Sequence, residues 1–186
     1  MFIAENRKLA TIKLNNMPTI NLNTSIKADI EVVFDLSRSV DLHKISTKHT
    51  NEKAIAGVTS GLIGENESVT WKAKHFGVYQ ELTSKITEFD RPNSFTDEIQ
   101  KGIFKNFKHQ HIFKYAEGKT EITDIFDYES PFGIIGQMAD KLFLTNYMRR
   151  FLIIRNETIK EFAESDKWKL VLLKNGEGIK LSLIHI

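Results

Sequence analysis

The 186-residue chain contains no cysteine, only three prolines and no long apolar run. Without cysteine, disulfides, thiol catalysis and cysteine-ligated zinc or iron–sulfur sites are excluded. No apolar segment approaches the roughly 20 residues that span a bilayer, and the first nineteen residues lack the hydrophobic stretch of a secretory signal. We therefore expect a cytoplasmic protein with no stable membrane insertion.

The chain also lacks a large excess of either positive or negative charge. The 26 basic residues nearly balance the 24 acidic ones, for a net charge of +2. This balance argues against a nucleic-acid partner, which a clustered positive face would bind. Apolar residues make up 41% of the chain and charged residues 27%, a globular composition. The 13 phenylalanines stand out, and they suit a large apolar core or an apolar cavity.

The two ends of the chain differ from its middle. Residues 1–17 precede the first alternating segment, and we expect them to be an N-terminal extension outside the fold. Residues 18–165 contain the regular patterns and form the predicted domain. Residues 166–186 are expected to be a tail, and residues 181–186 resemble an artefact of gene prediction.

Two hairpins follow from the alternation of apolar and polar residues. A two-residue turn at Phe76-Gly77 places Lys72 opposite Glu81, with apolar groups on the other face. A second turn, at Glu117-Gly118, joins the two most regular strands of the chain. Its inward pairs are predicted to be Phe107–Tyr128, His109–Phe126, His111–Asp124 and Phe113–Ile122.

Helices are predicted at both ends of the domain. Asp29 and Ser39 can cap two short helices after a first strand. Ser130 can cap a long C-terminal helix with Pro131 in its first turn, and we expect the first turns, around Gly133 and Gly136, to bend or to form a separate short helix. Its apolar stripe has spacings of three and four and comprises Ile135, Met138, Leu142, Thr145, Met148, Leu152, Arg155, Ile159 and Phe162.

This order of elements predicts an α+β fold. A curved antiparallel sheet of six to seven strands wraps around the long C-terminal helix, and two short helices follow the first strand. A single helix about 10 Å wide cannot fill the concave side of such a sheet. We therefore expect a cavity between the sheet and the helix.

The segments GIFKNFKHQHIF, TDIFDYESPFGIIG and RNETIKEF, in this order, resemble the START-like, or SRPBCC, superfamily with its helix-grip fold. The resemblance covers about residues 18 to 165 and is closest to the bacterial ligand-binding and polyketide-cyclase-like branch. The usual Gly-Pro-Phe before the histidine-rich strand is replaced by Gly102-Ile103-Phe104. The resemblance implies a deep cavity for lipids, sterols, polyketides or other hydrophobic molecules.

The residues predicted to line this cavity are those that alternate inward on the strands and on the helix. They are Trp71, His75, Leu82, Phe95, Ile99, Phe107, His109, His111, Phe113, Asp124, Phe126, Tyr128, Met138 and Leu142. His111 and Asp124 can hydrogen-bond and form a polar anchor for a ligand. The alternative is a buried structural pair that fixes the register of the two strands.

The remaining charged groups allow weaker hypotheses. His75 and His109 fall on inward faces near His111 and Asp124, but histidines two apart on a strand are no recognisable metal motif, so no metal or cofactor is assigned. Arg149, Arg150 and Arg155 are interpreted as a solvated helix face; docking on a membrane surface is the alternative.

The resulting functional hypothesis is the binding of a small hydrophobic ligand, in a carrier or sensor role. The alternative is a cyclase- or dehydratase-like enzyme that uses His, Asp and Tyr128 in the same cavity. A third possibility is a regulatory partner with a vestigial pocket. The sequence lacks the serine-hydrolase, zinc-protease and phosphate-loop motifs that would favour other enzymes.

Overall fold

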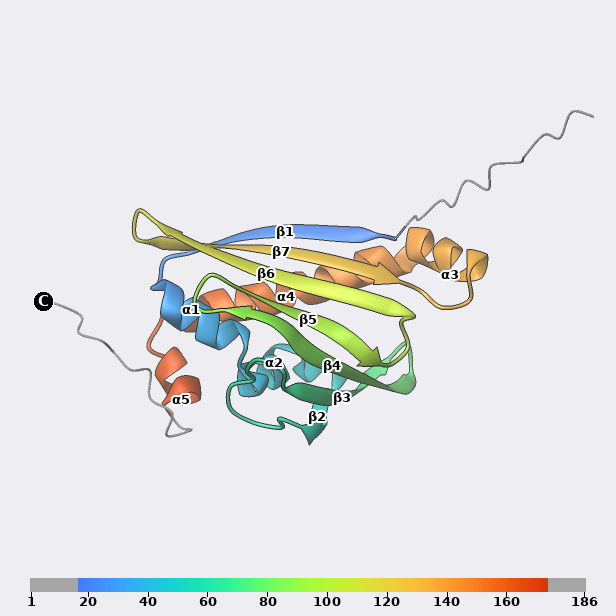
Figure 1. Cartoon of the computed structure of the whole chain (residues 1–186), viewed down its shortest axis with the longest axis horizontal. Helices are drawn as coiled ribbons and strands as arrows, with labels where there is room; N and C mark the ends of the chain where they lie inside the picture. The colour runs from blue at the N-terminus through green and yellow to red at the C-terminus, as the bar shows by residue number, and fades with distance from the viewer. Residues whose placement is uncertain (1–16, 174–186) are drawn as a thin grey trace, which may run out of the picture.

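A single antiparallel sheet of seven strands forms the body of the protein (Figure 1). The structure is a computed structural model and describes residues 17–173. The strands lie in the order β1-β7-β6-β5-β4-β3-β2. Their bounds are β1 Thr19–Ile26, β2 Lys53–Gly57, β3 Ser68–His75, β4 Val78–Asp90, β5 Ser94–Lys101, β6 Asn106–Ala116 and β7 Lys119–Glu129.

Both predicted hairpins are confirmed in register. Lys72 pairs with Glu81 across β3 and β4, and His111 pairs with Asp124 across β6 and β7. Each hairpin has a two-residue turn in which both residues have positive φ, Phe76-Gly77 in the first and Glu117-Gly118 in the second. This turn geometry matches the twist of paired strands, so the loop length fixes which residues face inward.

The strand β2 was not identified from the sequence. It is short, contains two alanines and a glycine, and is mostly exposed, so it has no alternation to detect. With it the sheet reaches seven strands, within the predicted six to seven.

Two short helices follow β1, as predicted. Asp29 accepts a hydrogen bond from the Glu31 backbone at the start of α1 (Ile30–Ser37). Ser39 accepts one from Leu42 at the start of α2 (Val40–Ser46). A short 3₁₀ turn, Lys48–Thr50, leads into β2. Both side-chain caps satisfy backbone donors that the first turn of a helix leaves unpaired.

The C-terminal helical segment has three parts. α3 (Ile134–Ala139) is followed by a π-helical turn, Asp140–Leu144, and then by α4 (Thr145–Ala163). The helical segment is therefore continuous from Ile134 to Ala163, with its irregular turn at Asp140–Leu144 and not around Gly133 and Gly136, and the proposed start is wrong. The segment begins after Gly133, and the Ser130 hydroxyl donates to Asp140 instead of capping the helix.

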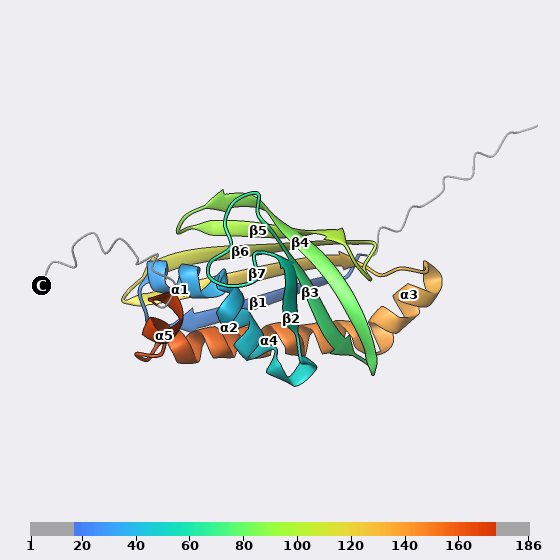
Figure 2. The same ribbon diagram turned by 90° about the horizontal axis from the view of Figure 1, so that it is seen from below.

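α4 runs along the concave side of the sheet, while α3 projects beyond the strand ends (Figure 2). The sequence prediction ended the domain at residue 165. The structure adds α5 (Trp168–Leu172), which buries Val171 and Leu172 in the core. Residues 1–16 and 174–186, which include most of the predicted extension and tail, lie outside the described residues. Among the described helices, none is both long and apolar enough to cross a membrane.

The buried apolar side chains form two clusters. One contains Phe34, Phe113, Ile122 and Ile159 near α1 and α5. The other contains Phe107, Phe126, Tyr128 and Leu152. On β6, β7 and α4 the residues between the two clusters are polar: His109 and His111, Asp124, and Arg155 with Asn156. A polar layer therefore crosses the interior between two apolar regions.

Candidate functional site

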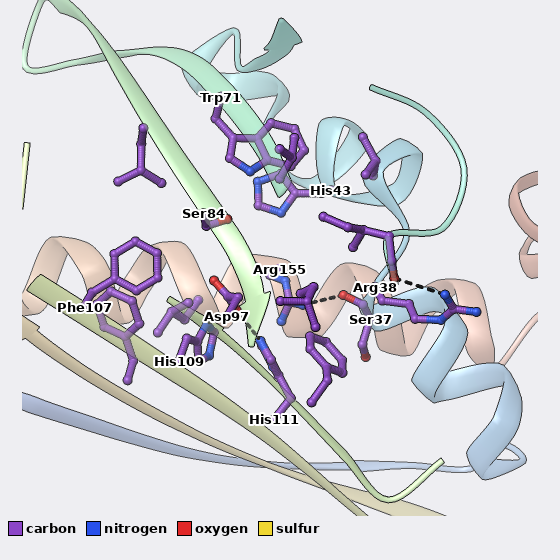
Figure 3. A pocket seen from close by; sticks show the side chains of 18 of the residues that line it. Ser37, Arg38, His43, Trp71, Ser84, Asp97, Phe107, His109, His111 and Arg155 are labelled. Carbon is purple, nitrogen blue, oxygen red and sulfur yellow. Dashed lines mark hydrogen bonds and ion pairs between the residues drawn. The ribbon is translucent and has the colours of Figure 1, made fainter. Parts of the chain in front are cut away.

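A cavity of about 160 Å³ lies between the sheet and α4, next to the polar layer (Figure 3). Its apolar wall includes Trp71, Phe95, Phe107 and Phe126, and its polar wall includes Asp97, His109, His111 and Arg155. A second cavity of about 110 Å³ shares part of its lining, including Trp71, Leu82 and Phe104, and therefore adjoins the first.

Most of the polar layer comes from three neighbouring strands. Asp97 on β5 is directly opposite His109 on β6, and Asp124 on β7 is directly opposite His111. Because successive side chains of a strand point to opposite faces, these four side chains share the inner face of the sheet, and the residues between them point to the other face. The register of two strand pairs thus brings two imidazoles and two carboxylates together.

Asp124 is the centre of this cluster. Its Oδ1 lies 3.1 Å from His109 Nε2 and 2.7 Å from His111 Nδ1. Its Oδ2 accepts a 2.6 Å hydrogen bond from Asn156 Nδ2 on α4. The residue is 0% exposed. Such a carboxylate is tolerated in the interior because donors surround it.

His111 joins the two carboxylates. Its Nδ1 faces Asp124, and its Nε2 lies 3.2 Å from Asp97 Oδ1 (Figure 3). The ring stacks on Phe95 with centroids 4.3 Å apart, which holds it in one orientation. An ionised carboxylate only accepts hydrogen bonds, so both contacts are satisfied together when the ring carries two protons.

α4 and α1 complete the cluster with a cation. Arg155 Nη2 donates a 2.6 Å hydrogen bond to the Ser37 backbone carbonyl at the end of α1. Its Nη1 lies 3.9 Å from Asp124 Oδ1. Arg155 is therefore not part of a solvated helix face, and this part of the prediction is wrong. The buried carboxylates need a positive neighbour, and the inward position of Arg155 in the stripe provides it.

The pKa values of the cluster follow from these contacts. Burial opposes ionisation of Asp124, but hydrogen bonds from His109 and His111 outweigh it and hold the pKa of this carboxyl well below its usual range. Burial likewise opposes ionisation of Asp97, and the hydrogen bond from His111 lowers its pKa. Burial and the neighbouring His111 lower the pKa of His109. Both carboxyls are thus ionised at neutral pH, and His109 is neutral.

The second cavity has its own titratable groups. His75 Nδ1 and the Tyr147 hydroxyl are 2.6 Å apart, and Glu52 lies 3.3 Å from His43. Burial lowers the pKa of His75. Burial opposes ionisation of Glu52, but the charge and hydrogen bond of His43 lower its pKa. Glu52, His75 and Tyr147 thus give the second cavity polar groups beside its aromatic walls.

Eight of the fourteen predicted site residues line one of the two cavities. They are Trp71, His75, Leu82, Phe95, Phe107, His109, His111 and Phe126. Ile99, Phe113, Asp124 and Tyr128 line neither; Phe113, Asp124 and Tyr128 are buried behind the walls. Tyr128 is fully buried, and its hydroxyl is 2.8 Å from that of Thr145.

The expected placement of Met138 and Leu142 is wrong, because both are exposed. Two features of the helical segment explain this. α3 lies beyond the ends of the strands (Figure 2), so no sheet covers it. The π-helical turn inserts one extra residue, which rotates the preceding stripe by about 100° relative to α4.

Sequence reasoning missed several residues of the polar wall. Asp97 lies two residues from both Phe95 and Ile99 on β5, so the alternation that assigned these two residues to the inner face applies to Asp97 as well and could have identified it. Asn156 gave no such signal, because it falls outside the apolar stripe. Ser84 lies opposite Val69 in the first predicted hairpin, on the inward face, so that register could have identified it. Ser37 and Glu52 reach the cavity from elements whose packing the sequence does not specify.

No family model matches the chain, and no curated protein matches it either. Solved structures match over most of their length. An aromatase/cyclase, Zhui from Streptomyces sp. R1128, has a TM-score of 0.64 at 12% identity, covering 80% of this chain and 94% of that chain.

Two further structures agree. A START superfamily protein from Mycobacterium smegmatis has a TM-score of 0.59 at 11% identity and covers 78% of this chain and 97% of that one. The major latex-like protein 151 of Panax ginseng has a TM-score of 0.59 at 18% identity, and the match covers 80% of this chain and 99% of that one. The chain has the START-like helix-grip fold. The fold prediction made from the sequence is confirmed, and at these identities the likeness establishes the fold alone.

Proposed function

We propose that the protein binds a small hydrophobic molecule in the paired cavities, as a cytoplasmic carrier or sensor. The observation that carries the proposal is the combination of aromatic walls with a polar layer at one end of the first cavity. Pockets of this composition bind by burying apolar surface, at about 25 cal/mol per Å², while a few polar groups orient the ligand.

The cavity volumes limit the size of the ligand. The two spaces measure about 160 and 110 Å³, and a dry cavity of about 150 Å³ holds one benzene. A molecule of two fused rings, or a short acyl chain, fits without repacking. A sterol needs the larger pockets of several hundred Å³ that other ligand sites offer.

The polar layer favours a ligand with one oxygen-bearing end. Asp97 is the most accessible carboxylate of the layer, with a side chain 20% exposed, and it lies beside His109 and His111. Arg155 adds a donor to the same polar wall from α4. A hydroxyl or carbonyl group of a ligand can form hydrogen bonds with these side chains. A purely aliphatic ligand would displace water from them without replacing its hydrogen bonds, which costs free energy.

A catalytic role is the second candidate, because His109 and His111 both face the cavity. A structural neighbour is an aromatase/cyclase by name. In such a role His109, neutral and held by Asp124, would act as the proton acceptor. Tyr128, the third group of the sequence hypothesis, is buried and bonded to Thr145, so we leave it out of this role.

The binding proposal is tested with 2-naphthol as a neutral two-ring probe, followed by tryptophan fluorescence, to which Trp71 in the cavity wall and Trp168 on α5 both contribute. Ser84 lines the first cavity, and Lys85 next to it points to the opposite face of the sheet. We expect saturable 1:1 binding that Ser84→Phe weakens at least tenfold and Lys85→Phe leaves unchanged. Equal affinities for the two variants, or no saturable binding by the unmodified protein, would overturn the proposal.

The two roles are separated by one further comparison. His109→Gln keeps the size of the side chain and removes the proton acceptor. A binding protein retains probe affinity within a few fold in this variant, and it turns over no polyketide-like substrate in either form. Turnover by the unmodified protein that His109→Gln abolishes would establish the catalytic role instead.

A further inference from the structure

Three potential metal ligands converge on one point of the polar wall. Asp97 Oδ1 lies 3.2 Å from His111 Nε2 and 3.8 Å from His109 Nδ1. One ligand atom from each of the three residues lies within 4.8 Å of the other two. Two atoms bound to one zinc ion at about 2.1 Å are about 3.4 Å apart in tetrahedral geometry. The three side chains therefore need only small movements to share one ion.

The other nitrogen of each imidazole is already occupied. His109 Nε2 and His111 Nδ1 both face Asp124 Oδ1, and Asn156 holds the second oxygen of that carboxylate. An ionised carboxylate accepts hydrogen bonds, so each of these nitrogens carries a proton. In neutral rings the lone pairs must then lie on His109 Nδ1 and His111 Nε2, which face Asp97.

Three atoms with lone pairs thus face one another at the edge of the cavity. Such a group repels itself unless a proton or a cation lies among its members. A proton on His111 satisfies only the contact to Asp97 and leaves His109 Nδ1 without a donor. A metal ion satisfies all three atoms.

We propose that Asp97, His109 and His111 form a binding site for a first-row divalent metal ion such as Zn²⁺ or Fe²⁺. Asp124 is the outer-shell carboxylate that fixes both imidazoles, the arrangement commonly found around metal-bound histidines. Two imidazoles favour these ions over Mg²⁺ and Ca²⁺, which prefer oxygen ligands.

The position of the site leaves coordination places open. Asp97, His109 and His111 line the cavity, whereas Asp124 lies behind them. Two histidines and one carboxylate leave room for water or for an oxygen atom of the bound ligand. Arg155 lies 3.9 Å from Asp124 and opposes a cation, but two ionised carboxylates offset its charge.

The site stands on side-chain geometry and does not require the apolar ligand. The test therefore uses the metal alone. Protein freed of metal with a chelator is titrated with Zn²⁺ in competition with a chromophoric chelator at pH 7.5, and with Co²⁺ by visible absorption. We expect one ion per chain at micromolar affinity or tighter, with the Co²⁺ absorption of a nitrogen- and oxygen-ligated site.

Variants identify the ligands. We expect Asp97→Asn and His111→Gln each to weaken Zn²⁺ binding at least tenfold, while His49→Gln, at an exposed histidine outside the cluster, leaves it unchanged. Circular dichroism checks that each variant is folded. Unchanged affinity in the Asp97 and His111 variants would overturn the proposal.

A measurement on the unmodified protein covers the case in which the variants unfold. Nitrogen-15 NMR of the histidine rings reports each nitrogen separately. Zn²⁺ should shift His109 Nδ1 and His111 Nε2 and leave the protonated nitrogens facing Asp124 in place. Shifts confined to other histidines, or no binding below millimolar Zn²⁺, would show that the cluster is structural only. Binding of 2-naphthol is measured separately, so failure of one proposal leaves the other standing.

Discussion

The two ends of the C-terminal helical segment show opposite relations between polarity and burial. In the second half of α4, Arg155 and Asn156 are buried among apolar neighbours. In α3 and the π-helical turn, Ile135, Met138 and Leu142 are exposed. The same spacing of apolar residues runs through both regions, so the stripe alone does not decide which side chains are buried.

This difference shows that the surface on which a helix packs decides which of its side chains are buried. α4 lies against the sheet, where the buried carboxylate of Asp124 requires partners. Asn156 donates a hydrogen bond to it, and the guanidinium of Arg155 lies 3.9 Å away as a positive neighbour. α3 extends past the strands and meets no such surface. A buried polar side chain on α4 is therefore a response to charges that other elements bring into the interior.

Substitution of Asp124, the centre of the buried polar layer, is expected to cause the largest loss of stability. Asp124→Ala leaves two imidazoles, the Asn156 amide and Arg155 without their shared partner. We expect a loss of about 3–5 kcal/mol in the free energy of unfolding, measured by urea denaturation. The matched control is Asp127→Ala on the same strand, facing away from the core, which should cost less than about 1 kcal/mol. Similar losses in both variants would contradict the central role of Asp124.

Two leucines ten residues apart test the comparison directly. Leu152 is 5% exposed and Leu142 is 73% exposed. Leu152→Ala should lower the free energy of unfolding by about 2–5 kcal/mol, because it opens space in the core. Leu142→Ala should change it by less than about 0.5 kcal/mol. A large loss from Leu142→Ala would mean that the π-helical turn packs against another surface in solution.

Two arginines of α4, one buried and one exposed, give a third pair of variants for this comparison. Arg155→Met keeps the side-chain length but leaves the Ser37 carbonyl without a donor and removes the positive charge beside Asp124. We expect a loss of about 1–3 kcal/mol, seen as a lower urea midpoint. Arg150→Met, at an exposed position, should lie within about 0.5 kcal/mol of the unmodified protein. Equal midpoints would show that the buried guanidinium is not needed.

The smallest effect is expected from pH, through His75 at the second cavity. Burial lowers the pKa of His75 from 6.5, while Glu52 opposes the shift and His49 adds to it. Below pH 6.5 the unfolded chain binds this proton more readily than the folded one. Stability contributed by the neutral ring is therefore present above pH 6.5 and lost as the pH falls towards the lower folded pKa.

The expected size is less than about 1 kcal/mol, because the ring is partly exposed. Urea midpoints between pH 5 and pH 8 measure it, and His75→Gln should flatten part of the decline. The glutamine variant also removes the contact with Tyr147, so Tyr147→Phe serves as the control that keeps the titrating ring. An unchanged slope in His75→Gln would assign the decline to other groups.

Local patterns were sufficient for much of the fold. The alternation around Phe76-Gly77 and Glu117-Gly118 predicts both hairpin registers, because a two-residue turn leaves one pairing with apolar groups on one face. Asp29 and Ser39 mark two helix starts, because the cap depends on the neighbouring backbone alone. The inward placement of His109, His111 and Asp124 follows from the same registers.

The sequence by itself therefore determined the strand pairs, the caps and the two histidines opposite an acid. Only the tertiary structure decided that Asp97 completes their cluster, that Arg155 and Asn156 enter the interior, and that Met138 and Leu142 stay outside. Register and capping are contacts between near neighbours in the chain. The rotation of α4 after a π-helical turn, and its docking on a curved sheet, depend on surfaces more than 100 residues away, as in the bond from Arg155 to Ser37.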